Sequence, residues 1–235
     1  MAEPSDFRLI NFVVQFGLLV SLTISTNFLT WLGVPYTAEG GMVVQKIHPA
    51  NWLIYGAFAV FIFDGFQPQW RGKRRSIPTA PELKLAISTF TLAALYGLLF
   101  TGSGNIIVLL DTFGPAVILA IIISETGIDQ RRKILRLLRI LLFSNAIIAI
   151  IETVMRHSVM PLYLNGIPFL PPGDEFRPTA LYDHPLTGAV LSLIGLLLPP
   201  PSRWERIYTG VMMLALVAFS GRAALLAAFV AWPNV

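Results

Sequence analysis

The sequence predicts an all-α fold, a polytopic membrane helix bundle of about seven to eight transmembrane helices with a cytoplasmic N-terminus. The first observation is composition: 55% of the 235 residues are hydrophobic and only 13% are charged, whereas about a quarter of the residues of an ordinary soluble domain are charged. The second is that the apolar residues form long runs, most of them long enough to cross hydrocarbon as helices. The third is that these runs lack the alternation of apolar and polar residues that a membrane barrel strand requires.

The apolar runs define the expected spans. They cover 9–32, 50–66, 84–100, 106–124, 139–155, 185–199 and 207–219. An eighth run begins at Ala223 and contains ten apolar residues before the sequence stops, which as a helix reach about 15 Å, half of a typical hydrocarbon core. We therefore expect residues 1–235 to form a single transmembrane domain that is truncated at its C-terminus, the N-terminal part of a longer protein.

The basic residues set the expected orientation. Of the 17 Lys and Arg side chains, 13 fall on one side of the membrane when the N-terminus is placed in the cytoplasm, as the positive-inside rule requires. The basic residues expected on the outer side are Lys46, Arg156, Arg177 and Arg222. The basic segment 128–139, IDQRRKILRLLR, is interpreted as a helix start at anionic lipid head groups, with a partner-docking surface as the alternative.

Composition and motifs exclude several functions. Without cysteine the chain has no disulfide, no thiolate metal site and no cysteine nucleophile. No Walker loop, dinucleotide-binding GxGxxG or HExxH motif is present, so we expect neither a cofactor nor a metal. The net charge of +4 is accounted for by cytoplasmic loops, and nucleic acid is not an expected partner.

Charge is concentrated in one short outer stretch, FRPTALYDHPLTG, at 176–188. Pro185 suits the first turn of the helix that follows, and either Asp183 or His184 would cap that helix. Such a helix start carries about half a positive charge and free N–H groups, which suit a phosphate. In the same helix Gly188 and Gly195 share one face, which allows another helix or a lipid tail to approach closely.

The span at 139–155 adds polar residues to the same side. Asn145, Glu152 and Arg156 lie within about 40° of one another on a helical wheel. Glu152 and Arg156 are four residues apart, so we expect them to pair, in a structural role rather than a catalytic one. Asp111, at the outer end of another span, is an intramembrane acid for which capping or snorkelling is the favoured explanation.

Arginine side chains at this outer surface favour one class of ligand. A guanidinium binds phosphate through a planar, bidentate fork and keeps its proton. Where no metal is held, such side chains can stabilise a departing diphosphate. The sequence therefore predicts that Arg177 and Arg222 bind a phosphorylated lipid head group. The alternatives are that Arg177 pairs with Asp174 or Glu175, and that His184 only caps its helix.

Two motifs resemble one family. FRPTALYDHPLTGAV resembles the Arg…His-Pro…Gly segment of bacterial O-antigen ligases and polysaccharide polymerases, and FSGRAALLAAFVAW resembles their Ser-Gly-Arg motif. The resemblance covers most of the chain. It implies a metal-independent, inverting glycosyltransferase of the bacterial inner membrane, which transfers or polymerises a glycan carried on undecaprenyl diphosphate at the outer face of that membrane.

The resemblance also implies roles for individual residues. Arg177 and Arg222 would neutralise the diphosphate leaving group, and His184 would orient it or the acceptor. Arg156, Asp183 and Glu152 are the further candidates for substrate binding. The pattern departs from the family at Leu186, where many members have Asn, and at Asp183, where Gly is frequent. The family's large outer loop, with the His expected to act as base, would follow residue 235.

The resemblance leaves two other classes of function open. A transporter or flippase for a lipid-linked or anionic solute would show charges near mid-membrane, broken helices and paired halves. A non-catalytic membrane subunit is the third possibility. The expected partners in the first case are the lipid-linked oligosaccharide, the bilayer and other polysaccharide-assembly proteins.

Overall fold

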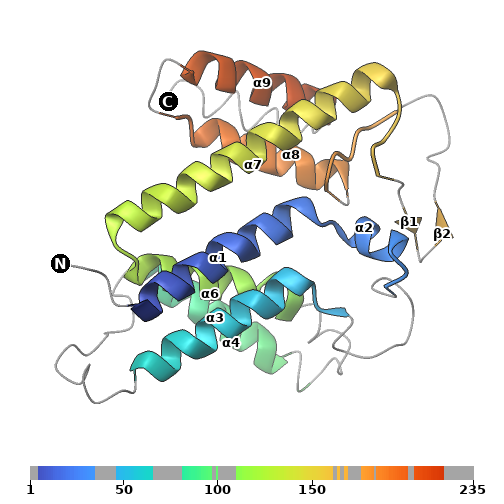
Figure 1. Ribbon diagram of the computed structural model, residues 1–235. Coiled ribbons are helices and arrows are strands. Elements are labelled where there is room, and N and C mark those ends of the chain that lie inside the picture. The colour runs from blue at the N-terminus through green and yellow to red at the C-terminus, as the bar shows by residue number, and fades with distance from the viewer. Residues whose placement is uncertain are drawn as a thin grey trace. The chain divides into compact units, whose positions relative to one another are not determined.

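The computed structural model of the 235-residue chain describes residues 5–34, 46–65, 81–96, 99, 110–160, 163–164, 167–168, 176–182, 184–200 and 204–219. Its regular elements are almost all α-helices, so the predicted all-α class is confirmed (Figure 1). The exception among these residues is a short antiparallel hairpin, in which β1 (Tyr163–Leu164) pairs with β2 (Ile167–Pro168).

The helices follow the predicted apolar runs. They are α1 (Ser5–Thr23), α2 (Thr26–Trp31), α3 (Pro49–Gly65), α4 (Pro81–Tyr96), α6 (Gly114–Glu125), α7 (Ile128–Met155), α8 (Pro185–Leu197) and α9 (Glu205–Ala218). Each of the seven runs therefore contains a helix, because apolar length without strand alternation is a strong helical signal. The eighth run, from Ala223, lies outside the described residues.

The first run differs from its prediction, because it is two helices rather than one. The chain leaves helical geometry at Ile24 and Ser25, between α1 and α2. Ser25 is extended, and its hydroxyl oxygen accepts a hydrogen bond from the Phe28 N–H at 3.1 Å. Serine is a favoured N-cap because its side chain satisfies a donor that the new helix leaves unpaired. The single span expected over 9–32 is thus interrupted by a cap.

One helix among the described residues, α7, is long and apolar enough to cross a membrane by length and composition. It has 28 residues, which at about 1.5 Å per residue exceeds a typical hydrocarbon core. Shorter apolar helices cover Leu9–Thr23, Pro49–Ile62 and Pro185–Leu197. The basic segment 128–139 is the first part of α7 itself, as predicted for a helix start, and its contact with lipid stays a prediction.

The chain forms two compact units. Unit 1 comprises Met1–Ser21 with Gly41–Ile134, and unit 2 comprises Leu22–Gly40 with Leu135–Val235. The core of unit 1 is built from apolar side chains of α1, α3, α6 and the start of α7. The core of unit 2 is built from α7, the segment 180–182, α8 and α9. The expectation of a single transmembrane domain over 1–235 stays a prediction.

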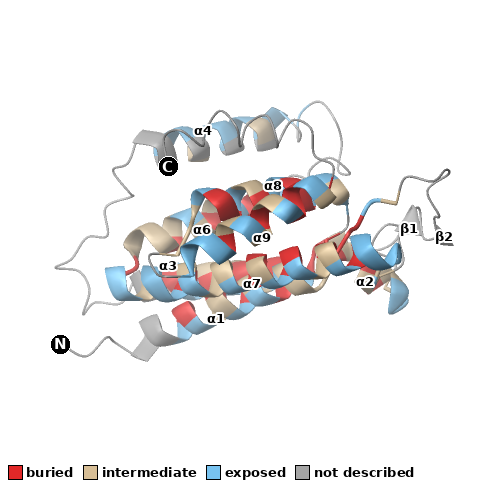
Figure 2. Cartoon of the chain, turned by 90° about the horizontal axis from the view of Figure 1, so that it is seen from above, coloured by how far each residue is buried: buried red, intermediate tan, exposed pale blue. Residues whose placement is uncertain are grey.

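In unit 2, α8 packs closely against α9 through its two glycines. A Cβ at Gly188 would lie 2.4 Å from the Phe219 ring, and one at Gly195 would lie 2.8 Å from the Met212 sulfur. Both glycines belong to a buried stripe along α8 (Figure 2). The predicted close approach is therefore confirmed, and the element that approaches is a helix, α9.

Two arginines of the basic segment bind the C-terminal ends of other helices. Arg131 donates to the carbonyl oxygens of Thr126 and Ser124, at 2.8 and 2.5 Å, just after α6 and near its end. Arg139 donates to the carbonyl oxygen of Leu198, just after α8, at 2.9 Å. Cations are favourable at these positions, because the last carbonyls of a helix lack internal partners and carry partial negative charge.

The α8–α9 contact can be tested with alanine. Gly188→Ala should destabilise the protein by about 1–3 kcal/mol, since the new methyl overlaps the Phe219 ring. Thermal unfolding in detergent should then show a midpoint several degrees lower. Gly210→Ala on α9 is the matched control, because nothing lies within 4 Å of a Cβ there. Adding Phe219→Leu to Gly188→Ala should recover part of the loss, and equal midpoints for the two alanine variants would contradict the packing.

Candidate functional site

The candidate site is the loop at 176–182, together with His184 at the start of α8. Its anchor is the Glu152 carboxylate of α7, which is 0% exposed. One carboxylate oxygen, Oε2, accepts the N–H groups of Thr179 at 2.9 Å and Ala180 at 2.8 Å. The other, Oε1, accepts the N–H of Val159 at 2.6 Å. Bonds of this charge-assisted kind offset the cost of burying the carboxylate.

The loop makes a tight turn where it meets this carboxylate. The Tyr182 N–H donates to the Thr179 carbonyl at 2.9 Å, and Ala180 has φ 52°. A positive φ is uncommon for a residue with a Cβ, and persists only when the surroundings hold it. Two successive N–H groups that converge on one oxygen form an anion-binding concavity. The protein's own carboxylate fills that concavity.

Asn145, two turns earlier on α7, binds the same loop. Its Oδ1 accepts the Leu181 N–H at 3.2 Å. Its Nδ2 donates to the carbonyl oxygens of Leu141 and Leu22, at 3.1 and 3.2 Å. Leu22 is in the last turn of α1, where carbonyls lose their helical partners. The predicted alignment of Asn145 and Glu152 on one face of α7 is thus confirmed.

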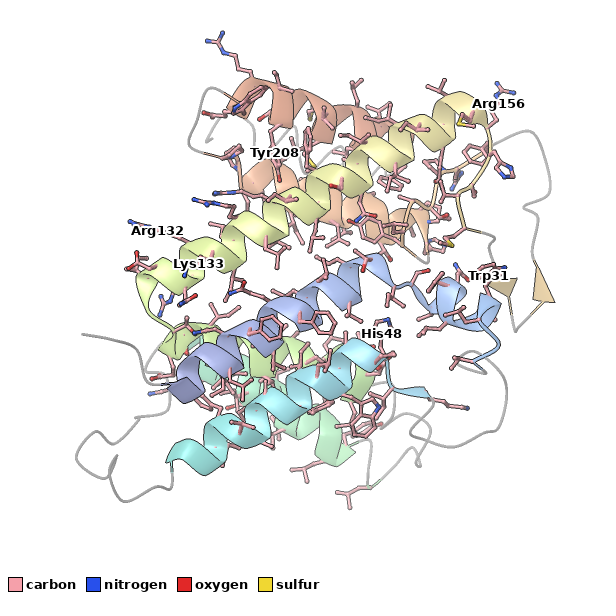
Figure 3. All side chains as sticks on the ribbon, in the orientation of Figure 1. Trp31, His48, Arg132, Lys133, Arg156 and Tyr208 are labelled. Carbon is pink, nitrogen blue, oxygen red and sulfur yellow. The ribbon has the colours of Figure 1, made fainter. Side chains whose placement is uncertain are left out.

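The predicted pair of Glu152 and Arg156 is wrong. Both residues are described, and no ion pair joins them, since Glu152 is bonded to backbone N–H groups instead. The four-residue spacing requires a helix that continues, but α7 ends at Met155 and Arg156 has φ 50°. Arg156 is exposed at this end of the helix (Figure 3).

Of the two residues expected to cap α8, Asp183 and His184, it is His184 that occupies the capping position. It is extended, with φ −145° and ψ 141°, and Pro185 is the first residue of α8. Its Nδ1 accepts the Leu186 N–H at 3.1 Å. In a neutral ring the proton is then on Nε2, which is a donor. The ring is exposed, so this donor can reach a ligand.

The remaining predicted site residues are only partly described. Arg177 is exposed and is followed in the loop by buried Pro178, Thr179 and Ala180. Asp183 and Arg222 lie outside the described residues, so the expected convergence of Arg177 with Arg222 stays a prediction.

Tyr182, at the end of the loop, is buried in the core of unit 2. It is 7% exposed, and its ring is tilted against Phe219 with centroids 6.4 Å apart. Burial raises the pKa of the Tyr182 phenol above its ordinary value, because the phenolate would be poorly solvated. Tyr182 is therefore a neutral packing residue at physiological pH.

A second polar cluster in unit 1 was not predicted as a whole. The Asp111 Oδ1 accepts the His48 N–H at 2.6 Å and the Asn51 Nδ2 at 2.8 Å. The Tyr55 hydroxyl donates to the Leu110 carbonyl at 2.5 Å. Asp111 thus caps the start of α3, which confirms capping as its explanation (Figure 3 labels His48).

The sequence signal for this second cluster was a repeated dipeptide. A histidine stands just before each helix, since Pro49 is the first residue of α3 and Pro185 is the first residue of α8. The His48 Nδ1 accepts the Ala50 N–H at 3.2 Å. Within the part of the chain that the structure describes, no three His, Asp or Glu side chains gather as metal ligands.

Comparisons with known proteins identify no relative of the chain. No protein-family model matches the chain, and no curated protein and no solved structure is significantly similar to it. The function is therefore argued from the site and from the motif resemblance alone.

The capping role of His184 is separable from any role in binding. His184→Ala should cost about 1 kcal/mol of stability, because the Leu186 N–H loses its acceptor, whereas His184→Asn keeps a favoured N-cap and should cost little. The measurement is thermal unfolding in detergent. His157→Ala serves as control, since that histidine is exposed and caps no helix start. Equal loss in the alanine and asparagine variants would contradict the capping geometry.

Proposed function

We propose that the chain is a polytopic inner-membrane protein of the O-antigen ligase or polysaccharide polymerase type. It transfers or polymerises an undecaprenyl-diphosphate-linked glycan at the outer face of the membrane. The observation that carries the proposal is that exposed Arg177 and His184 stand on a loop fixed by the buried Glu152 carboxylate. The resemblance of 176–190 and 219–232 to the family's two motifs gives that site its chemistry.

Exposed apolar side chains support the membrane setting. Phe12 on α1, Leu92 on α4 and Val154 on α7 are 65%, 68% and 80% exposed. Only 33% of the most apolar 18-residue window of α7 is buried, unlike the core helix of a soluble protein. Large exposed apolar surfaces mark contact with lipid or with other proteins.

The contacts within each unit agree with the expected orientation. In unit 1, His48 binds Asp111, and both are expected on the outer side. In unit 2, the loop at 179–180 binds the outer end of α7, while Arg139 binds the end of α8 that is expected on the inner side. These pairings are the ones that helices of alternating direction would make.

The proposed chemistry is substitution at the anomeric carbon of the glycan. The acceptor hydroxyl oxygen attacks the anomeric carbon and forms the new glycosidic bond, and its proton passes to a general base. The bond from the anomeric carbon to the diphosphate oxygen breaks, and the diphosphate leaves on its lipid. Arg177 and Arg222 offset the negative charge that develops on the diphosphate. The Nε2 donor of His184 orients the diphosphate or the acceptor.

A transporter or flippase is the second candidate, because the break between α1 and α2 resembles the discontinuous helices of transporters. In transporters the freed backbone groups bind the transported solute. Here the Leu22 carbonyl is bonded to Asn145, and the Ser25 hydroxyl caps α2. The polar groups of this break are thus used by the protein itself, which favours the transferase.

The orientation can be measured with single cysteines, because the natural sequence has none. In intact cells whose outer membrane admits the reagent, a membrane-impermeant maleimide should label His157→Cys, which is expected outside. It should label Lys133→Cys, expected in the cytoplasm, only after the inner membrane is permeabilised. Both positions are exposed. Labelling of both in intact cells, or of Lys133→Cys alone, would contradict the proposed topology.

Activity tests the site. Arg177→Ala or Arg222→Ala should lower transfer by about 100-fold or more, as loss of a charge-stabilising donor does. Arg177→Lys should recover little, since lysine lacks the bidentate fork. His184→Asn should lose activity while it keeps the helix cap. The readout is the length of the glycan on undecaprenyl diphosphate and on the final acceptor.

The pattern of products separates the candidates. Short chains with intact carrier-linked units indicate a polymerase, and long carrier-linked chains that are not attached indicate a ligase. Carrier-linked units retained on the cytoplasmic side indicate a flippase. His157→Ala is the matched control on the outer side, and unchanged glycans in all the site variants would reject the assignment.

A further inference from the structure

We infer that Asn145 and Glu152 are positioning residues, which fix where Arg177 and His184 stand without touching a ligand themselves. The inference rests on the proposed function in one respect, that one of its two tests measures glycan transfer. It assigns to Glu152 a role different from the substrate binding that the sequence suggested, and it brings in Asn145.

Burial is the first step of the argument. Glu152 is 0% exposed and Asn145 is 1% exposed. The backbone that Glu152 binds is also enclosed, since Thr179 and Ala180 are 3% and 0% exposed. A diphosphate or a sugar outside the loop therefore has no surface of Glu152 or Asn145 to contact, whereas Arg177 and His184 are exposed.

The second step is how many parts of the chain the two side chains join. Glu152 binds the N–H of Val159 and two N–H groups of the turn. Asn145 binds the next N–H of the turn, that of Leu181, and the Leu22 carbonyl at the end of α1. Three successive N–H groups of the loop at 176–182, those of residues 179, 180 and 181, are thus bonded to one face of α7.

The third step is that the residue types fit these partners. A carboxylate only accepts, so it suits three N–H groups, whereas an amide both donates and accepts, so it suits a carbonyl on one side and an N–H on the other. In Glu152→Gln one oxygen becomes an NH₂ group, which faces either the Val159 N–H or the two N–H groups of the turn, according to the orientation of the amide. In either orientation the side chain no longer joins Val159 to the turn at Ala180, which has φ 52°, so the surroundings that hold this turn are weakened.

The experiment uses a nitroxide as a reporter of loop order. The chain has no cysteine, so Arg177→Cys carries the only label. The label should be motionally restricted in the otherwise unchanged protein, mobile with Glu152→Gln or Asn145→Ala, and partly restricted again with Glu152→Asp, which keeps the carboxylate. Thr153→Ala is the matched control, because that exposed hydroxyl binds only the Ala149 carbonyl of its own helix, at 2.8 Å.

Transfer activity is measured in parallel on chains that keep Arg177. Glu152→Gln and Asn145→Ala should lower the transfer rate about 10- to 100-fold, as displacement of a positioned group does. Glu152→Asp should recover part of it, and Thr153→Ala should leave it unchanged. The variant that combines Glu152→Gln with Asn145→Ala should lose less transfer activity than the product of the two single losses, because both substitutions release the same loop.

The outcomes separate this inference from the proposed function. An unchanged line shape at position 177 in both Glu152→Gln and Asn145→Ala would overturn the positioning role, even if activity fell. A label that becomes mobile in both variants supports it. If the unaltered protein transfers no glycan but the label still becomes mobile, the proposed function fails and the positioning of the loop stands.

Discussion

The site depends on the buried carboxylate of Glu152 and its three backbone N–H partners. A buried ion costs several kcal/mol of solvation, and each hydrogen bond to a charged group returns about 1.5–3 kcal/mol. Three such bonds are made, to the N–H groups of Val159, Thr179 and Ala180, and together they offset that cost. The carboxylate and the turn therefore stabilise each other. Among the described residues α7 is the longest helix, so the turn is bonded to the longest helix of unit 2.

The same dipeptide, His-Pro, begins a helix in each unit, and the two copies differ in exposure. His48 is 8% exposed and lies beside Asp111 and Asn51. His184 is exposed, and it caps its helix with one ring nitrogen only. The same capping hydrogen bond therefore belongs to a buried histidine in unit 1 and to an exposed histidine, whose Nε2 can donate, in unit 2. Exposure, rather than the motif, distinguishes a structural histidine from a candidate for binding.

Apolar length predicted the helices well, because it is a property of whole segments. Local interruptions were not predictable in the same way. The cap at Ser25 lies inside an apolar run, so composition hides it. The pair of Glu152 and Arg156 failed because helical spacing applies only while the helix lasts, and α7 ends at Met155. The partners of Glu152 are backbone N–H groups, which carry no signal in the sequence. By contrast, the cap before Pro185 was predicted as either Asp183 or His184, and His184 provides it, since capping is a local interaction.

Several charged or polar side chains bind helix ends. Arg131 and Arg139 bind the C-terminal carbonyls of α6 and α8, where a cation complements the helix dipole. Asp111 and the two histidines serve helix starts. Arg177 is a cation in the segment that leads into the start of α8, which itself carries partial positive charge. An anion between them would be attracted by both, and a phosphorylated lipid head group has that chemistry.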